Sequence, residues 1–268
     1  MDPPGPRGFE SHPRRQQTRL SEMFFDKFNM FDFVFFIMFV SLYMEADKIL
    51  VSDSLQETLW RLEEARYGFR KKSDDTVREA LDWILTRQGL PKSYLNLFAP
   101  TDKDFLQGLR LLTGELVRSG AALRHIIGEE TLRTAIVWGL RSSPTVKQAL
   151  EGFDQILERG ARKTGTYCCH NCTIAFLRTL AVVKPKEWDE IFEKGMNKIR
   201  KARTNDGKWH SYPFYYTLLM LSELKTPLAH AELKHANKTA EKLLQRYRGD
   251  DRTSRFRKFA LEATLNVT

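Results

Sequence analysis

Gly165-Thr166-Tyr167 precedes Thr173-Ile174-Ala175-Phe176-Leu177-Arg178-Thr179-Leu180, and Gly207-Lys208-Trp209 precedes Thr217-Leu218-Leu219-Met220-Leu221-Ser222-Glu223-Leu224. Each stretch consists of a glycine, a spacer, an aromatic residue, a short loop and an apolar helix that opens with threonine. The two glycines lie 42 residues apart and the two threonines 44 apart. A period of about 40–50 residues with helix-pair content is typical of stacked helical repeats. The two stretches therefore predict stacked helix pairs.

The same pattern extends toward the N-terminus, where Thr131-Leu132-Arg133-Thr134-Ala135-Ile136-Val137-Trp138 begins 42 residues before Thr173. A turn with a proline follows each apolar helix, at Pro144, Pro185 and Pro227. Proline fits the first turn of a following helix, because the N–H that it lacks would have no partner there. An amphipathic segment follows each turn. We therefore expect at least three pairs, each with an apolar inner helix and an amphipathic outer helix.

From Asp53 onward the chain reads as one helix after another. Asp53 or Ser54 and Ser73-Asp74-Asp75 are expected N-caps, and Gly89 and Pro91 are expected stops. Another helix is expected to start at Thr101 or Asp102 and to end at Gly120, with Phe105, Leu109, Leu112 and Leu116 facing inward. The later helices are expected at 131–140, 144–157, 172–183, 187–203, 216–224, 228–248 and 253–265. Because no alternating strand pattern is found, the sequence predicts an all-α fold.

Composition limits the class of protein. The 268 residues contain 42% hydrophobic and 29% charged residues, which is typical of a globular chain of one large or two small domains. The net charge of +9 favours acidic partners, although the 34 acidic residues are mixed with 43 basic ones. The three cysteines are clustered and odd in number, so they do not form a disulfide framework. A reducing, cytoplasmic location is the simpler expectation.

The composition of the N-terminal residues differs from that of the rest of the chain. We therefore divide the chain into residues 1–22, residues 23–46 and a helical-repeat domain over 47–268. Residues 1–22 are rich in proline and arginine, which predicts disorder. The stretch 23–44 holds eight phenylalanines, and its uninterrupted apolar run Phe33–Met44 is shorter than the about 20 residues of a membrane-spanning helix. It is interpreted as a membrane-associated segment, a buried or capping helix, or an extension upstream of the true start. We expect a chain that begins near Met44 to keep its helicity.

The loop Asn205-Asp206-Gly207-Lys208-Trp209 and the run Phe214-Tyr215-Tyr216-Thr217 resemble the terpenoid cyclase and protein prenyltransferase superfamily. In that superfamily an aspartate-glycine-x-tryptophan turn joins helices of an α/α toroid, and a Phe-Tyr-His-Thr run opens an inner helix of the prenyltransferase β-subunit. The resemblance covers about residues 130–250. The fold is therefore expected to be an α/α toroid or an α-solenoid.

The resemblance does not extend to the catalytic motifs. Tyr216 occupies the position of the family's zinc-ligating histidine, and the family's Asp-x-Cys zinc pair and the acidic signatures of the cyclases have no counterpart. Asp206 and His210 are the candidate catalytic residues, although Asp206 is also expected to close the turn and Trp209 to join neighbouring helix pairs. Five aromatic residues are candidates to line an apolar cavity, where they could also stabilise a cation, or else to pack in the core: Trp209, Tyr212, Phe214, Tyr215 and Tyr216.

The run Tyr167-Cys168-Cys169-His170-Asn171-Cys172 is the strongest chemical candidate. Cys168 and Cys172 are four residues apart, hence on one face of a helix, and thiolates and imidazole are good zinc ligands. Cys168, Cys172 and His170 are the candidate ligands, but a second cluster is missing, so His125 or His210 would have to complete a site through space. Core packing and a reactive thiol are the other interpretations.

Three functions follow as hypotheses. The first is a helical-repeat protein that binds an apolar ligand or a protein partner without the family's catalytic residues. The second is an enzyme acting on a prenyl or other lipid-like substrate. The third is a helical repeat that binds the nucleic-acid backbone, because basic residues gather near 66–72, 194–203 and 246–258.

Overall fold

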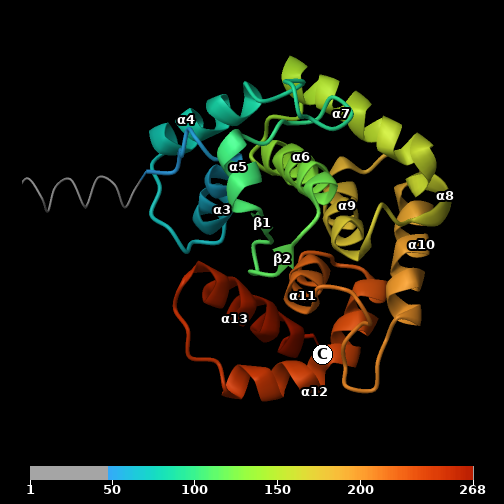
Figure 1. The fold of residues 1–268 in the computed structure, drawn as a ribbon. Coiled ribbons are helices and arrows are strands. Elements are labelled where there is room, and N and C mark those ends of the chain that lie inside the picture. Colours follow the sequence, from blue (N-terminus) through green and yellow to red (C-terminus); the bar gives the residue numbers. More distant parts are fainter. Residues whose placement is uncertain (1–47, 268) are drawn as a thin grey trace, which may run out of the picture. The chain divides into compact units, whose positions relative to one another are not determined.

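Helices follow one another through residues 48–267, the part of the chain that the computed structural model describes (Figure 1). The elements in chain order are α3 (Leu55–Arg66), α4 (Asp74–Leu85), α5 (Asp102–Gln107), β1 (Leu109–Arg110), β2 (Leu116–Val117), α6 (Gly120–Val137), α7 (Pro144–Ile156), the π-helix η1 (Leu157–Ala161), α8 (Arg162–Thr164), α9 (His170–Val183), α10 (Trp188–Lys201), α11 (Phe214–Ser222), α12 (Pro227–Gln245) and α13 (Arg252–Leu265). The predictions for 1–22, for 23–46 and for the apolar run within it lie outside the described residues. The all-α prediction is confirmed by this helical content.

The helices lie in an inner and an outer set (Figure 1). The inner set is α3, α6, α9, α11 and α13, which contact one another in chain order, and α4, α7, α10 and α12 lie outside them. Nearly every residue of α6 and α9 between Ala122 and Ala135 and between Cys172 and Leu180 is buried. The outer helices bury one face only, as in α10, where Ile191, Met196 and Ile199 are buried.

Local signals set most helix ends where the sequence analysis expects them. Ser54 caps α3, and Ser73 caps α4 in a capping box with Thr76. Proline occupies the first turn of α7 and of α12, behind the caps Ser143 and Thr226. Pro185, in contrast, lies before α10, whose N-cap is Glu187, so here the proline belongs to the turn and not to the helix.

The helix predicted from 101 to 120 is wrong beyond its first turns. The short α5 ends at Gly108, whose φ of 72° is strained for other residues, and β1 and β2 then form a two-stranded antiparallel hairpin. Gly114, with φ 87°, lies in its turn. Leu116, predicted to face inward, is exposed. Helix α6 starts at Gly120, eleven residues before the predicted start at 131, because Ser119 provides the cap.

Residues 101–117 cap two inner helices, which the repeat pattern does not predict. The buried carboxylate of Asp104 accepts hydrogen bonds from the backbone N–H of Leu55 at 3.0 Å and from the hydroxyl of Ser54 at 2.7 Å, at the start of α3. Glu115 accepts from the N–H of Tyr215 and Tyr216 at 3.0 and 3.1 Å, at the start of α11. Because α11 follows Pro213, which has no side-chain acceptor, Glu115 supplies the missing cap.

The loops before α9 and α11 make comparable contacts. Gly165, with φ 67°, lies against the backbone of Ile191 and Gly195 on α10. Gly207, with φ 77°, lies against His235 and Thr239 on α12. In both cases the loop that precedes an inner helix packs on the outer helix that follows it, and a β-carbon at the glycine would overlap that outer helix.

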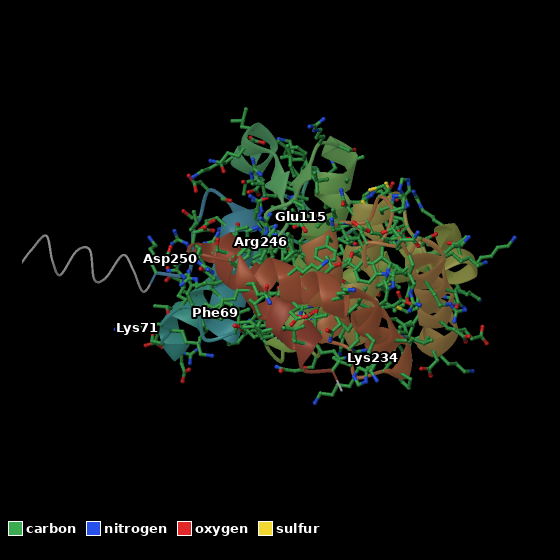
Figure 2. All side chains as sticks on the ribbon, turned by 90° about the horizontal axis from the view of Figure 1, so that it is seen from below. Phe69, Lys71, Glu115, Lys234, Arg246 and Asp250 are labelled. Carbon is green, nitrogen blue, oxygen red and sulfur yellow. The ribbon has the colours of Figure 1, made fainter. Side chains whose placement is uncertain are left out.

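The last inner helix, α13, returns to the first. Tyr67 and Phe69, just after α3, pack edge-on against Phe256 and Phe259 of α13, with ring centroids 4.8–6.3 Å apart (Phe69 is labelled in Figure 2). Ion pairs between the two helices add to this aromatic contact, since Arg252 bonds Glu57 at 2.7 Å. Residues at the two ends of the described chain therefore share one core.

Across residues 48–267, the helices are all too short or too polar to meet the requirements of a membrane-crossing segment.

Candidate functional site

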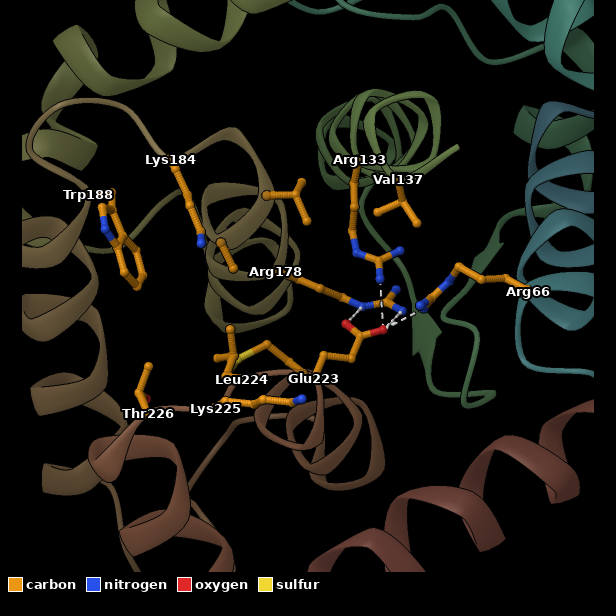
Figure 3. A pocket seen from close by; sticks show the side chains of 13 residues that line it. Arg66, Arg133, Val137, Arg178, Lys184, Trp188, Glu223, Leu224, Lys225 and Thr226 are labelled. Carbon is orange, nitrogen blue, oxygen red and sulfur yellow. Dashed lines mark hydrogen bonds and ion pairs between the residues drawn. The ribbon is translucent and has the colours of Figure 1, made fainter. Parts of the chain in front are cut away.

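A cluster of arginines and glutamates lies among the inner helices. Arg133 of α6 and Arg178 of α9 are almost completely buried, and Arg66 at the end of α3 is partly exposed. All three bond Glu223, the residue just after α11, at 2.7–2.8 Å (Figure 3). One carboxylate thus joins four of the five inner helices.

Two further carboxylates complete the cluster. Glu63 of α3 accepts from Arg66, Arg133 and Arg178 at 2.8, 3.0 and 3.1 Å, and Glu130 of α6 accepts from Arg178 at 2.8 Å. Three positive and three negative side chains therefore balance. A buried charge without such partners would be costly, so each member depends on the others.

The charges decide which form each group takes. Burial alone would raise the pKa of Glu63, but the charges of Arg133, Arg178 and Arg66 outweigh it and lower the pKa to about 2. The same arginines lower the pKa of Glu223 far below the ordinary value of 4.5, against the effect of burial. Both carboxyls are therefore ionised at neutral pH, and neither can act there as a general acid.

A cavity of about 440 Å³ opens beside this cluster (Figure 3). Arg66, Arg133, Arg178 and Glu223 form one side of it. The remaining wall is mainly apolar and comes from the C-terminal ends of α6, α9 and α11 and the start of α10: Val137, Ala181, Val182, Trp188, Met220 and Leu224. Lys184 and Lys225, at the turns after α9 and α11, also line it, and Lys184 extends into the space between Trp188 and Arg178 in Figure 3.

A second constellation lies at the start of α9. The ligating atoms of His125, Cys168 and Cys172 all lie within 4.8 Å of one another, with Cys172 Sγ 3.8 Å from His125 Nδ1. Cys169 Sγ is 3.5 Å from Cys172 Sγ. His125, on α6, is one of the two histidines that the sequence analysis named as completing a site through space. His170 faces Tyr212 instead, at 4.4 Å between ring centroids.

The pKa values of His125 and of two of the thiols are shifted strongly from their ordinary values. Burial, with a small contribution from Arg124, lowers the pKa of His125 to about 4, so the imidazole is neutral. The hydrogen bond between the thiols of Cys169 and Cys172 lowers the pKa of Cys169 to about 5 and raises the pKa of Cys172. An open hollow of about 380 Å³, lined by Cys168, Cys169, Tyr212 and other residues, lies in front of them.

The five aromatic candidates do not converge on one cavity. Trp209 is buried and donates from Nε1 to Glu232 of α12 at 2.8 Å, which ties the loop before α11 to the outer helix that follows it. Tyr212 lines the hollow beside the cysteines. Phe214 lies between Trp209 and Tyr215 in a chain of ring contacts, at 6.0 and 5.2 Å.

Tyr216 is buried, and its hydroxyl donates to Glu130 of the arginine–glutamate cluster. This phenol stands where the resembling family has a zinc-ligating histidine. A hydrogen-bonded phenol beside Glu130 and Arg178 does not fit a zinc site, so the family's metal position is not matched at this place.

The candidate catalytic residues Asp206 and His210 both lie exposed in the loop before α11. Asp206 pairs with Lys208 at 3.1 Å and accepts from the hydroxyl of Thr204, and these contacts lower its pKa. The turn around it is closed by backbone hydrogen bonds, including Thr204 N–H to the carbonyl of Lys208 at 2.9 Å. Neither residue lines the cavity beside Glu223.

Sequence reasoning missed the residues that build the cavity. Arg133, Arg178 and Glu223 stand inside or at the end of the apolar helices that define the repeat. A charged residue in an otherwise buried helix needs a partner or a ligand, and this was the available signal. The partners themselves lie up to 157 residues apart in the sequence, as Arg66 and Glu223 do, and no local pattern reveals this.

Comparison with known proteins gives no relative: no family model matches the chain, and neither do curated proteins or solved structures.

Proposed function

We propose that the helix pairs are copies of one repeat unit, arranged like the α/α toroid of the terpenoid cyclase and protein prenyltransferase superfamily. Three observations support this. The inner helices contact one another in chain order, α13 returns to α3, and the loops before α9 and α11 pack alike on α10 and α12. Residues 101–117 would then be an insertion before the inner helix α6.

Within this fold, the proposed function is the binding of a ligand that has an apolar body and an acidic head, such as a phosphate or a carboxylate. One observation carries it: five cationic side chains and one carboxylate line a cavity of about 440 Å³ whose other wall is mainly apolar. Cavities of about 300–1,000 Å³ are the usual size for small-molecule sites. The first hypothesis from the sequence is an apolar ligand, and the cavity adds that this ligand carries a negative charge.

The lysines carry the argument for an acidic head. The three arginines of the wall already pair with Glu63, Glu130 and Glu223, so their charges are balanced. Lys184 and Lys225 have no ion pair within the described residues, and Lys184 lies 5.6 Å from the ring of Trp188. Their two positive charges are the excess in this cavity, and they can bond an anion.

Binding is better supported than catalysis. An enzyme acting on a lipid-like substrate needs an acid or base at the cavity wall, and Glu223 is the one carboxylate among its lining residues. Its lowered pKa and three arginine partners keep it ionised and occupied. Asp206 and His210 lie elsewhere, so the lining residues include neither of the acid–base candidates of the enzyme hypothesis.

Isothermal titration calorimetry with farnesyl diphosphate, farnesol and pyrophosphate tests the proposal. Farnesyl diphosphate should bind more tightly than farnesol, which lacks the charge, and than pyrophosphate, which lacks the chain. Replacing both lysines (Lys184→Gln with Lys225→Gln) should weaken its binding at least about tenfold, which corresponds to about 1.4 kcal/mol. A matched control removes two exposed lysines outside the cavity, Lys186 and Lys234, and should leave the affinity unchanged.

Equal affinities for the two double variants would contradict a site beside Trp188. A fatty acid, titrated in the same way, tests a carboxylate head. If neither farnesyl diphosphate nor the fatty acid binds, the proposed ligand class is contradicted.

One observation favours nucleic acid as a second candidate. A hollow of about 610 Å³ is lined by Arg203, Lys208, Lys238, Lys242 and Arg246 (Arg246 is labelled in Figure 2). Arg203 and Lys208 pair with Glu232 and Asp206, which leaves the α12 cations as the excess. Binding to the phosphate backbone should weaken steeply with salt, and an affinity unchanged between low and moderate salt would exclude this candidate.

A further inference from the structure

Four potential metal ligands meet where α6 passes the start of α9. In a tetrahedral zinc site with Zn–S bonds of about 2.3 Å, neighbouring ligand atoms lie about 3.8 Å apart. Cys172 Sγ is 3.8 Å from His125 Nδ1 and 3.5 Å from Cys169 Sγ, and Cys168 lies within 4.8 Å of both His125 and Cys172. The atoms of His125, Cys168 and Cys172 are therefore close enough together to bind one ion, and Cys169 Sγ adjoins this group through its contact with Cys172 Sγ.

The backbone at the adjacent cysteines departs from a continuous extended chain. In an extended chain, neighbouring side chains point to opposite sides. Cys168 has a φ of 53°, a left-handed conformation that is uncommon for residues other than glycine, whereas Cys169 is extended and is the N-cap of α9. Strained residues of this kind gather at ligand sites, where the surrounding structure holds them.

A buried carboxyl beside the thiols lacks a partner. Glu129, one turn after His125 on α6, is fully buried, and neither of its carboxyl oxygens has a hydrogen-bond partner among the described residues. Burial and the nearby Glu130 and Cys169 raise the pKa of this carboxyl, which places Glu129 close to the cysteine cluster. Most buried polar groups in proteins are hydrogen-bonded, so this carboxyl is free to bond a ligand or the ligating side chains next to it. Residues next to metal ligands commonly bond them from behind.

We propose that His125, Cys168, Cys169 and Cys172 bind one zinc ion, which fastens the start of α9 to α6. Three sulfurs and one imidazole nitrogen form a closed tetrahedral set, which is typical of structural zinc sites. The site goes beyond the proposed ligand cavity and does not depend on it. It is also a different place from the zinc site of the superfamily that the chain resembles, because the position of that superfamily's zinc-ligating histidine is occupied by Tyr216 in this chain.

The test is the metal content of the full chain, purified without added chelator and desalted after incubation with zinc chloride. We expect one zinc per chain. His125→Ala and Cys168→Ser should each lose it, and Cys168→Ser, at an exposed residue, is the variant least able to disturb the fold. His170→Ala is the matched control, because His170 is adjacent in sequence but faces Tyr212, and it should keep the zinc.

Cobalt provides a second readout. Replacing zinc by Co²⁺ should give the visible absorption of a tetrahedral ion and a sulfur-to-cobalt charge-transfer band, both absent in Cys172→Ser. Circular dichroism of each variant separates loss of metal from loss of fold. Three results would overturn the proposal. The first is a chain that holds no zinc after incubation, and the second is zinc retained in both His125→Ala and Cys168→Ser. The third is a Cys169–Cys172 disulfide in the zinc-treated protein.

Discussion

Gly165 and Gly195 meet backbone to backbone. A β-carbon at Gly195 would lie 2.6 Å from the carbonyl oxygen of Gly165, and one at Gly165 would lie 2.2 Å from the amide nitrogen of Gly195. The loop before α9 can therefore rest on α10 only because neither residue has a side chain. Gly152 of α7, 43 residues before Gly195 in the sequence, receives the carbonyl of Leu95 in the same way, at 1.9 Å from its β-carbon position.

The first prediction concerns this contact. Gly195→Ala should lower the free energy of unfolding by about 3 kcal/mol or more, because the added methyl meets backbone that cannot move aside. Gly120→Ala is the control, since a β-carbon there meets nothing within 4 Å, and its effect should stay within about 0.5 kcal/mol. Urea denaturation measures both. Equal stabilities of the two variants would mean that the loop does not rest on α10.

The sequence predicts those features of the fold that depend on neighbouring residues and misses those that depend on distant ones. Caps such as Ser54 and Ser73 and the helix-starting Pro144 and Pro227 act through neighbouring residues, so a local pattern reveals them. The hairpin after Gly108 could not be predicted in this way, because its apolar residues also fit a helix period. The cap that Asp104 of α5 provides to α3 and the cap that Glu115 of the hairpin provides to α11 depend on contacts across 49 and 100 residues.

A second prediction concerns the buried charges. Arg178→Met keeps most of the side-chain volume but leaves Glu63, Glu130 and Glu223 without their common partner. Breaking a buried ion pair in this way typically costs about 3–5 kcal/mol. Arg78→Ala, at an exposed pair with Asp75, should change the free energy of unfolding by no more than about 0.5 kcal/mol. A small loss for Arg178→Met would show that the cluster is not needed for folding.

The third prediction is an acid transition. The folded pKa of Glu63 is lowered to about 2 from 4.5, so this carboxyl contributes stability at pH values above 4.5 and loses it as the pH falls toward 2. Glu223 acts in the same direction. Urea denaturation between pH 7 and pH 2 should show stability falling by a few kcal/mol below pH 4.5. Glu63→Gln, although less stable at pH 7, should show a shallower fall, and an unchanged slope would exclude Glu63 as a source.

The candidate sites differ in how much the sequence reveals of them. The cysteines lie close together in the chain, so the sequence names Cys168 and Cys172, with His170, as metal candidates, and it names His125 or His210 as a partner through space. The cavity beside Glu223 was missed, because its charged wall comes from single residues on four inner helices. Arg133 and Arg178 interrupt apolar helices, and Arg66 and Glu223 lie at helix ends, but only the packing of the helices shows that these residues face one another.

The last prediction returns to the aromatic residue of the second loop. Trp209 donates to Glu232, which also accepts from Arg203 at 2.9 Å, so one buried carboxylate ties the loop before α11 to α12. Trp209→Phe keeps the apolar ring but removes this hydrogen bond to a charged acceptor, which should cost about 1.5–3 kcal/mol of the free energy of unfolding. Trp83→Phe is the control, because the Trp83 indole makes no hydrogen bond through Nε1 among the described side chains and is only half-buried. Its loss should be smaller by about 1 kcal/mol. If both variants lose the same amount, Trp209 acts through its packing alone, and the carboxylate of Glu232 does not hold the loop.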